Sequence, residues 1–429
     1  MGRSVAGRIA LLVLALAACL VACGGSEGGP SGRPTPTPVA SSRPPSTRHV
    51  PEDFPTIQAA VDATVAGDLV LVGPGTYHEA VRVRTDRVVV RGLDRNAVIL
   101  DGQHRLDNGI TVNSDGVAVE NLTVHGYRFN GVIFNATYGG ADPYDPSAVL
   151  RGYRVSYVTA YGNGLYGVYA FGARGGLFEE SYASGHPDSG FYIGRCDPCD
   201  AVVRHVTADG NVVGFQGTNA SGNLFIVESE WRGNRVGIQP NSDTEEGNLP
   251  QHDATIVGNV VADNDNPATP PSDTGEFGYG IALGGASRDV VERNLVIGNA
   301  NTGIALLGDN KGFLASDNRV AGNVLRDNGV DLEYLSPTGD GRGNCFEGNV
   351  LTTSFPAEIE RLLPCSGATG GIPPATARQR VEIPQGVGYQ DLPPPPAEPN
   401  LPNAGTAPGR PATGMPTLDV ASISVPSAP

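Results

Sequence analysis

Three stretches, ATIVGNVVADN (254–264), DVVERNLVIGN (289–299) and NRVAGNVLRDN (318–328), repeat one phrase and decide the fold. Apolar and polar residues alternate along each phrase, which is typical of a β-strand with one buried face. The third position is apolar, and the sixth and eleventh are asparagine, in all three. Positions three, six and eight cannot all point to one side of a straight strand. Each phrase is therefore predicted to hold two short strands joined at a corner.

Weaker copies of the phrase begin at residues 117, 153, 176, 201, 224 and 344, and their uninterrupted spacing is about 23–25 residues. In stacked strands, equivalent asparagines would lie about 4.8 Å apart, within reach of one another's amides. Two ladders of side-chain amides are therefore expected. The corner series is Asn259, Asn294, Asn323 and Asn349, and the turn series is Asn163, Asn211, Asn234, Asn264, Asn299 and Asn328.

A further strand follows most phrases and begins with Gly and an apolar residue, as in GFYIG (190–194) and GIALG (280–284). Each repeat thus supplies about three short strands and no helix. A repeat of this length and content predicts an all-β solenoid, in which parallel strands stack coil upon coil.

The segment FPTIQAAVDATVAGDLVLVGPGTYHEAV (54–81) precedes the repeats. Together with them it resembles the right-handed parallel β-helix proteins of the pectin-lyase-like superfamily. The resemblance implies a β-helix domain over 51–365 with a short N-terminal capping helix. Such a helix covers apolar core and strand edges that an open coil would expose. The residues expected on its buried side are Ile57, Ala60, Val61 and Val65. This fold hosts lyases, hydrolases, epimerases, adhesins and accessory proteins, so function has to be argued from a site.

The N-terminus predicts export. Arg3 and Arg8 accompany a short apolar run, which is typical of a signal peptide over 1–22. The run ends in LVAC, which resembles the lipobox of bacterial lipoproteins and makes Cys23 the expected lipidation site, with Cys19 as the second candidate. We expect a lipoprotein on the outer face of the cell membrane, or a secreted protein if no lipid is added.

Both ends of the chain have a composition that is typical of linkers. Residues 23–50 are rich in Pro, Ser, Thr and Gly and are expected to form a tether. Residues 366–429 contain DLPPPPAEPNLP and few large apolar side chains, so we expect them to be largely disordered or to lie extended on the domain. An exported chain favours disulfides, and the local pairings are Cys196–Cys199 and Cys345–Cys365.

The middle rungs carry a candidate binding surface. Along the Gly-apolar strands, the residue between two inward positions should face solvent, and in four successive strands these residues are Tyr169, Tyr192, Gln216 and Gln239. Aromatic rings stack on sugar faces and amides bond hydroxyls, so this stripe predicts a polysaccharide site. Three long interruptions border the same face and would wall a groove, at about 137–152, 241–253 and 265–277.

The stretch SYASGHPDSGFYIGRC (181–196) departs from the repeat, because His186 stands where most turns have Asn. Asp188, Tyr192 and Arg195 lie near the same rung. His and Tyr can move protons and Arg can neutralise a substrate carboxylate, so the four are candidate catalytic residues for β-elimination or C5 epimerisation. The alternative is structural: His186 replaces Asn as a hydrogen-bonding turn residue.

A glycoside hydrolase would instead need facing carboxylates. Asp188 is one candidate, and its partners could come from the loops, namely Asp142, Asp145, Asp243, Glu245 or Glu246. No cofactor is expected. The acidic loops offer oxygen ligands for Ca²⁺, but no calcium motif of fixed spacing is present, so no metal ligands are assigned.

Three functions follow from these observations. The first is a lyase, epimerase or glycoside hydrolase that acts on an extracellular or envelope polysaccharide. The second is a non-catalytic carbohydrate-binding or structural surface lipoprotein, and the third is a periplasmic metal-handling accessory protein. Two methionines and seven histidines count against the third. The net charge of −16 argues against nucleic acid as a partner. We expect the chain to act as a monomer.

Overall fold

The computed structural model describes residues 43–140, 145, 147–272, 275–308, 312–367 and 370–427. They belong to one compact unit, Arg43–Pro429. The predicted signal peptide, Cys19, Cys23 and most of the predicted tether lie outside the described residues.

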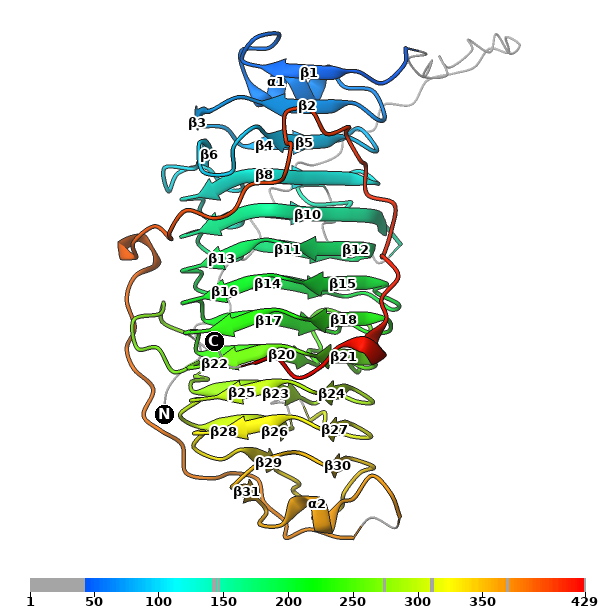
Figure 1. Ribbon diagram of the computed structural model, residues 1–429, viewed down its shortest axis with the longest axis vertical. Helices are drawn as coiled ribbons and strands as arrows, with labels where there is room; N and C mark the ends of the chain where they lie inside the picture. The colour runs from blue at the N-terminus through cyan, green and yellow to red at the C-terminus, as the bar shows by residue number, and fades with distance from the viewer. Residues whose placement is uncertain are drawn as a thin grey trace, which may run out of the picture. The chain divides into compact units, whose positions relative to one another are not determined.

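The described strands form two parallel sheets, of 20 and 11 strands (Figure 1). The larger one has two faces joined through β8 and β10, so the coil has three faces, which we call the first, second and third sheet. The first sheet contains β1 (Thr47–Val50), β2 (Leu69–Val72), β5 (Val89–Gly92), β8 (Val117–His125), β10 (Leu150–Tyr161), β12 (Ala173–Glu179), β15 (Ala201–Arg204), β18 (Leu224–Val227), β21 (Ala254–Val257), β24 (Val290–Glu292), β27 (Arg319–Ala321) and β30 (Cys345–Glu347). The second contains β3 (Gly75–Tyr77), β6 (Val98–Asp101), β13 (Tyr182–Ser184), β16 (Thr207–Asp209), β19 (Glu230–Arg232), β22 (Val260–Ala262), β25 (Leu295–Ile297) and β28 (Val324–Arg326), and it shares β8 and β10 with the first.

The third sheet is formed by the Gly-apolar strands. Its members are β4 (Val81–Val83), β7 (Ile110–Val112), β9 (Val132–Phe134), β11 (Val168–Phe171), β14 (Ser189–Gly194), β17 (Val213–Thr218), β20 (Val236–Asn241), β23 (Tyr279–Gly284), β26 (Thr302–Leu307), β29 (Leu332–Tyr334) and β31 (Ser354–Phe355). This topology is a right-handed parallel β-helix, which confirms the predicted fold.

Most phrases split into two strands, as their apolar spacing predicts, whereas those that begin at 117 and 153 lie in the single long strands β8 and β10. Residues 254–264, for example, form β21 and β22, and Gly258 lies between them with a φ of 70°. At the equivalent corner Arg293 has a φ of 54°. This left-handed conformation turns the chain, so that the third and eighth residues of the phrase both face inward. One continuous apolar core results, with Trp231 fully buried in it.

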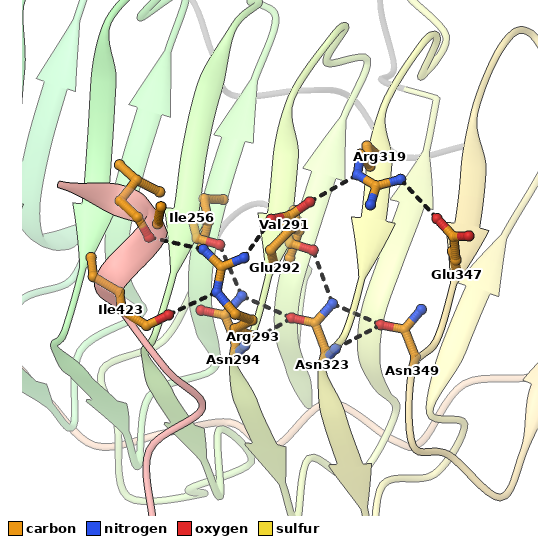
Figure 2. Close-up of polar contacts among 12 residues, drawn as sticks. Ile256, Val291, Glu292, Arg293, Asn294, Arg319, Asn323, Glu347, Asn349 and Ile423 are labelled. Atoms are coloured by element: carbon orange, nitrogen blue, oxygen red, sulfur yellow. Dashed lines mark hydrogen bonds and ion pairs between the residues drawn. The ribbon is translucent and has the colours of Figure 1, made fainter. Parts of the chain in front are cut away.

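Both predicted asparagine ladders are present. At the corner, the backbone N–H of Asn294 and its Nδ2 both donate to Oδ1 of Asn323, each at 2.9 Å, and Asn323 repeats this with Asn349 (Figure 2). In the turn, Asn234 donates in the same way to Asn264, at 3.1 and 2.9 Å. Each buried amide therefore satisfies the backbone at a corner that no strand ladder reaches.

Helices occur at the ends of the coil. Helix α1 (Ile57–Asp62) covers the N-terminal end, and Ile57, Ala60 and Val61 are buried beneath it as predicted, whereas Val65 is partly exposed. Helix α2 (Ile359–Leu362) lies at the other end (Figure 1). Strand β1 already pairs with β2, so the coil begins at Thr47, before the predicted boundary at residue 51.

The C-terminal segment, residues 370–427, lies extended along the coil and holds two short 3₁₀ helices, η1 (Tyr389–Asp391) and η2 (Val420–Ser422). In Figure 1 it climbs from the C-terminal end to the first rungs and then returns to β21. Arginines of the coil hold it: Arg91 donates to the carbonyls of Ala404 and Ala407, and Arg293 donates to that of Ile423 at 2.8 Å (Figure 2). These contacts agree with the second of the two expectations, a segment that lies extended on the domain, because guanidinium donors compensate for the scarcity of apolar side chains.

Candidate functional site

The predicted Tyr/Gln column forms in register on the outer face of the third sheet. Tyr169 pairs with Tyr192, and Tyr192 pairs with Gln216, which in turn pairs with Gln239. The column points away from the core, as expected. However, Tyr192 is only 1% exposed and Gln239 only 8%. Loops fold over these side chains, which corrects the expectation of an exposed stripe.

Aromatic rings gather around Tyr169, where the column is still partly open. Its ring centroid lies 4.7 Å from that of Tyr166 and 4.8 Å from that of Tyr192, and both pairs are stacked. Phe171 stacks at 5.8 Å. Flat aromatic faces of this kind pack well against the C–H faces of sugars.

Two cavities meet at this aromatic cluster. A cavity of about 570 Å³ lies between Tyr166 and the loop 241–253. A second cavity of about 700 Å³ reaches β4 and β7. Tyr138 and Tyr169 line both, so the two form one continuous depression across β4, β7, β9 and β11, which we call the aromatic groove.

The two ends of the aromatic groove carry opposite charge. Arg82, Arg105 and Arg128 line the end near β4, together with one acidic residue, Asp107. The end near β11 is lined by acidic residues of the loop, namely Asp243, Glu245 and Glu246. In a chain of net charge −16, the arginine-lined end is a local exception that suits an anionic group.

Glu246 has the most distinctive electrostatics of the groove. The hydroxyl of Tyr192 donates to its Oε1 at 2.6 Å, and its Oε2 is buried without a hydrogen-bond partner. Burial raises the pKa of Glu246 to about 8, and the nearby carboxylates Asp243 and Asp188 add to the shift. The side chain is therefore a neutral carboxylic acid at pH 7, able to donate a proton.

Asp188 stands behind the groove wall. It accepts hydrogen bonds from the hydroxyls of Tyr166 and, at 2.8 Å, Ser189. Burial raises the pKa of Asp188, and burial followed by the charge of Asp188 raises that of Tyr166 well above its ordinary value. Tyr166 lines the groove. Asp188 can therefore act on a ligand through Tyr166, and the site holds two tyrosine–carboxyl pairs, Tyr166–Asp188 and Tyr192–Glu246.

His186 lies inside the turn ladder and away from the groove. Its ring is fully buried. Nδ1 is 2.7 Å from Oδ1 of Asn211, and Nε2 is 3.2 Å from Nδ2 of Asn163. A neutral ring with its hydrogen on Nδ1 satisfies both contacts, and burial lowers the pKa of His186 to about 4. The geometry matches the structural alternative for this residue.

The remaining predicted residues are engaged by the protein itself. Gln216 Oε1 accepts from Ser189 at 2.9 Å, and Gln239 Nε2 donates to Glu276 at 2.6 Å. The guanidinium of Arg195 lies 5.5 Å from the ring centre of Phe171 and borders a small cavity beside the groove. Of the predicted site residues, the structure therefore brings Tyr169, Tyr192, Asp188 and Arg195 together with the acidic loop.

Sequence analysis missed Tyr138, Tyr166 and Phe171. Tyr138 belongs to the first long loop, whose composition gave no sign that this side chain would face the groove. Tyr166 precedes its strand by two residues, outside the column that was followed. Phe171 is two residues after Tyr169 and was predictable from strand alternation alone.

The structure confirms both predicted disulfides, Cys196–Cys199 and Cys345–Cys365. The first follows β14 directly, so it restrains the turn beyond Tyr192. Within the described residues, no group of three His, Cys, Asp or Glu side chains is placed to hold a metal ion. Asp142 lies outside those residues.

The family model for the right handed beta helix region matches residues 149–270 and 253–360. The mannuronan C-5 epimerase AlgE6 A-module of Azotobacter vinelandii is similar, with 16% identity, 70% of this chain and 92% of that chain covered, and a TM-score of 0.45. Pectate lyase Pel9A is 15% identical over 73% and 76% of the two chains, with a TM-score of 0.44. The periplasmic alginate epimerase AlgG is 12% identical over 72% and 83%, with a TM-score of 0.39. No curated protein matches the sequence.

The match over residues 149–360 and the coil topology together make this chain a right-handed parallel β-helix protein. At these identities, the likeness to the solved structures concerns the fold. In the part of the chain that the structure describes, no helix is long and apolar enough to cross a membrane.

Proposed function

We propose that the aromatic groove binds a polysaccharide and that Glu246 supplies a proton while the bound chain is modified. The observation that carries this proposal is a carboxyl with a pKa of about 8 beside a platform of stacked tyrosines. Perturbed carboxyls in a cavity are typical of sites that move protons.

The groove suits a sugar chain with acidic groups. Tyr138, Tyr166 and Tyr169 offer ring faces and hydroxyls along its length. The arginines at the β4 end can bond a carboxylate with two parallel N–H groups. A uronate-containing polysaccharide is therefore the substrate class that this surface favours.

The three predicted reaction types share one requirement, a proton donor near the scissile or epimerised sugar. In hydrolysis or β-elimination, the proton of Glu246 would go to the glycosidic oxygen as the C–O bond breaks. In C5 epimerisation, it would go to the carbanion left when a base removes the C5 proton. The proton that is lost comes from the attacking water in hydrolysis and from C5 in elimination and epimerisation. Tyr166 is the candidate acceptor of this proton, and it would pass its own hydroxyl proton to Asp188 at the same time. The reaction type stays open among these three.

The test is a screen of the purified chain against neutral and uronic-acid glycans. Reducing ends report hydrolysis, absorbance of unsaturated products reports elimination, and proton exchange at C5 reports epimerisation. We expect turnover of a uronate polymer by one of these signals and its loss in Glu246→Gln. Binding without turnover would favour the non-catalytic alternative, which the burial of Tyr192 and of Glu246 Oε2 supports.

We further propose that the chain is exported and anchored by a lipid on Cys23. The support is the LVAC motif after a short apolar run. In a bacterial host, Cys23→Ser should move the protein from the membrane fraction to the soluble fraction, because one thioether-linked lipid is lost. Cys19→Ser should leave it in the membrane fraction. The reverse pattern would assign the lipid to Cys19.

A further inference from the structure

The cavities of the aromatic groove lie over the outer column of the third sheet from β4 to β11, and other segments cover that column beyond β11. Thr111 and Ile133 of the column are only 4% and 0% exposed, but they line the cavities. Tyr169 lines both cavities of the groove. The residues at the equivalent position of the following strands of the third sheet point away from the core, yet most of them are buried. Their exposed fractions are 1% for Tyr192, 8% for Gln239, 3% for Ala282, 0% for Ala305 and 0% for Glu333. Gln216 is partly exposed, and its Oε1 is bonded to Ser189.

Three segments make this cover. Glu246 of the loop 241–253 lies on Tyr192, and Glu276 lies on Gln239. Farther along, the C-terminal segment brings Arg380 to within 2.6 Å of Glu333 and Arg378 to within 3.3 Å. Glu333 is fully buried, so removing its partners would leave an uncompensated charge. The part of the cover that the C-terminal segment supplies is therefore a fixed part of the fold.

We propose that the aromatic groove is closed at its Glu246 end, which we call the blind side. It would therefore accept the end of a polysaccharide chain and act on terminal sugars. This inference rests on the proposed function. Strand spacing makes the floor from β4 to β11 about 14 Å long, enough for a short oligosaccharide. The chain end would stop against Glu246 and the Tyr192 hydroxyl, while the arginines at the β4 end would hold inner sugars. Among the described residues, the contact of Glu246 with Tyr192 blocks the path of an internal segment along the column beyond β11.

Binding of end-labelled oligosaccharides tests this without requiring turnover. The probes are hexasaccharides of mannuronate and of galacturonate that carry a bulky fluorophore at the reducing or at the non-reducing end. For the hexasaccharide that binds, a label on the end that must enter the blind side should weaken binding by about tenfold or more. A label on the other end should change it by less than about twofold. Equal affinities for the two labelled forms would overturn the inference and leave the proposed function standing. Failure of every hexasaccharide to bind would overturn the proposed function, and this inference with it.

A shortened loop provides the matched variant. Replacing residues 244–248 with two glycines removes the wall at Tyr192, and four of these five residues are exposed. If this variant keeps its melting temperature, it should bind both labelled forms with affinities within about threefold of each other. Retained discrimination in a folded variant would show that the wall lies elsewhere and would contradict the assignment to Glu246. In the unaltered chain, short products of uniform size should accumulate while most of the polymer keeps its length.

Discussion

The same rungs of the coil carry two polar clusters that differ in how completely they are bonded. In the turn ladder, Asn211 donates to Asn234 at 2.9 and 3.0 Å, and both nitrogens of His186 have amide partners. In the aromatic groove, Glu246 has one oxygen bonded to Tyr192 and one buried without a partner. The turn ladder thus consists of side chains that are hydrogen-bonded to one another, whereas the groove contains a carboxyl whose burial favours its neutral form.

This difference separates structural polar residues from functional ones better than residue type does. His186 is the more familiar catalytic side chain, yet its two contacts fix a single neutral form and leave no site for a ligand. Glu246 lies on an irregular loop that lines the groove, and burial raises the pKa of its carboxyl to about 8. An unpartnered oxygen and a raised pKa indicate a site for chemistry only where the group also lines a cavity. Glu246 lines the groove, whereas Asp289, which shares the other two features, is fully buried.

The largest expected effect is that of Glu246→Gln on turnover. The amide preserves the shape and the acceptor for Tyr192 but cannot donate an acidic proton, so kcat should fall by about a hundredfold or more. Steady-state kinetics on the substrate found in the screen measures it. Glu347→Gln, at an exposed position on the first sheet, serves as the control. A variant with unchanged kcat would remove Glu246 from the chemistry.

Removing the aromatic platform should weaken binding. In Tyr169→Ala the ring that lines both cavities is lost, and affinity for a bound oligosaccharide should fall by about tenfold. Calorimetric titration measures the change. Tyr161→Ala, which removes a ring stacked on His125 away from the groove, should leave affinity unaltered. Similar losses in both variants would place the glycan site elsewhere.

Breaking the corner ladder should lower stability but not affinity. Asn323→Ala leaves the Asn294 amide and the carbonyl of Val291 without partners in the core, at a cost of about 1–3 kcal/mol. Chemical denaturation compares it with Thr352→Ala, at an exposed position on a neighbouring turn. Equal free energies of unfolding would contradict the role assigned to the ladder.

Asp289 offers a gain in stability. Asp289 is the first residue of a further side-chain ladder, which continues with Asn318 and Asn344. Its Oδ2 lies where an asparagine would have its amide nitrogen, and this oxygen is buried without a hydrogen-bond partner. Burial raises the pKa of Asp289 from 3.8 to about 7. In the folded protein the Asp289 carboxyl therefore keeps its proton above pH 3.8, where the unfolded chain loses it. The free energy of unfolding consequently falls as the pH rises from 3.8 through about 7. Asp289→Asn should stabilise the fold by about 1 kcal/mol at pH 8 and by less at pH 5. A variant less stable than the parent at pH 8 would show that the carboxyl is preferred there.

His186→Asn should have the smallest effect. It restores the residue used by the other rungs of the turn ladder, so the melting temperature and kcat should both stay close to those of the parent. Differential scanning calorimetry and kinetics on the same preparation are needed. A stable variant without activity would move His186 from the ladder into the mechanism.

The coil could be predicted from sequence because its physical causes repeat. Apolar residues at fixed positions set the strands, and asparagines at two columns, such as Asn294 and Asn299, set the ladders. The groove could not be predicted as fully, because loops without periodicity close it. The contact between Tyr192 and Glu246 joins residues 54 positions apart, and nothing in the repeat requires it. For a related reason the sequence left open whether the tail is disordered or lies on the domain, since its binding depends on distant arginines such as Arg91.

The most direct test of the account is the titration of the Glu246 carboxyl. Carbon-13 labelling of glutamate side chains, with Glu246→Gln to assign the signal, gives its pKa by NMR. We predict a midpoint near pH 8, because the carboxyl is buried beside Tyr192 and its second oxygen has no partner. A midpoint near the ordinary value of 4.5 would show that Glu246 is charged at neutral pH and would contradict its role as proton donor.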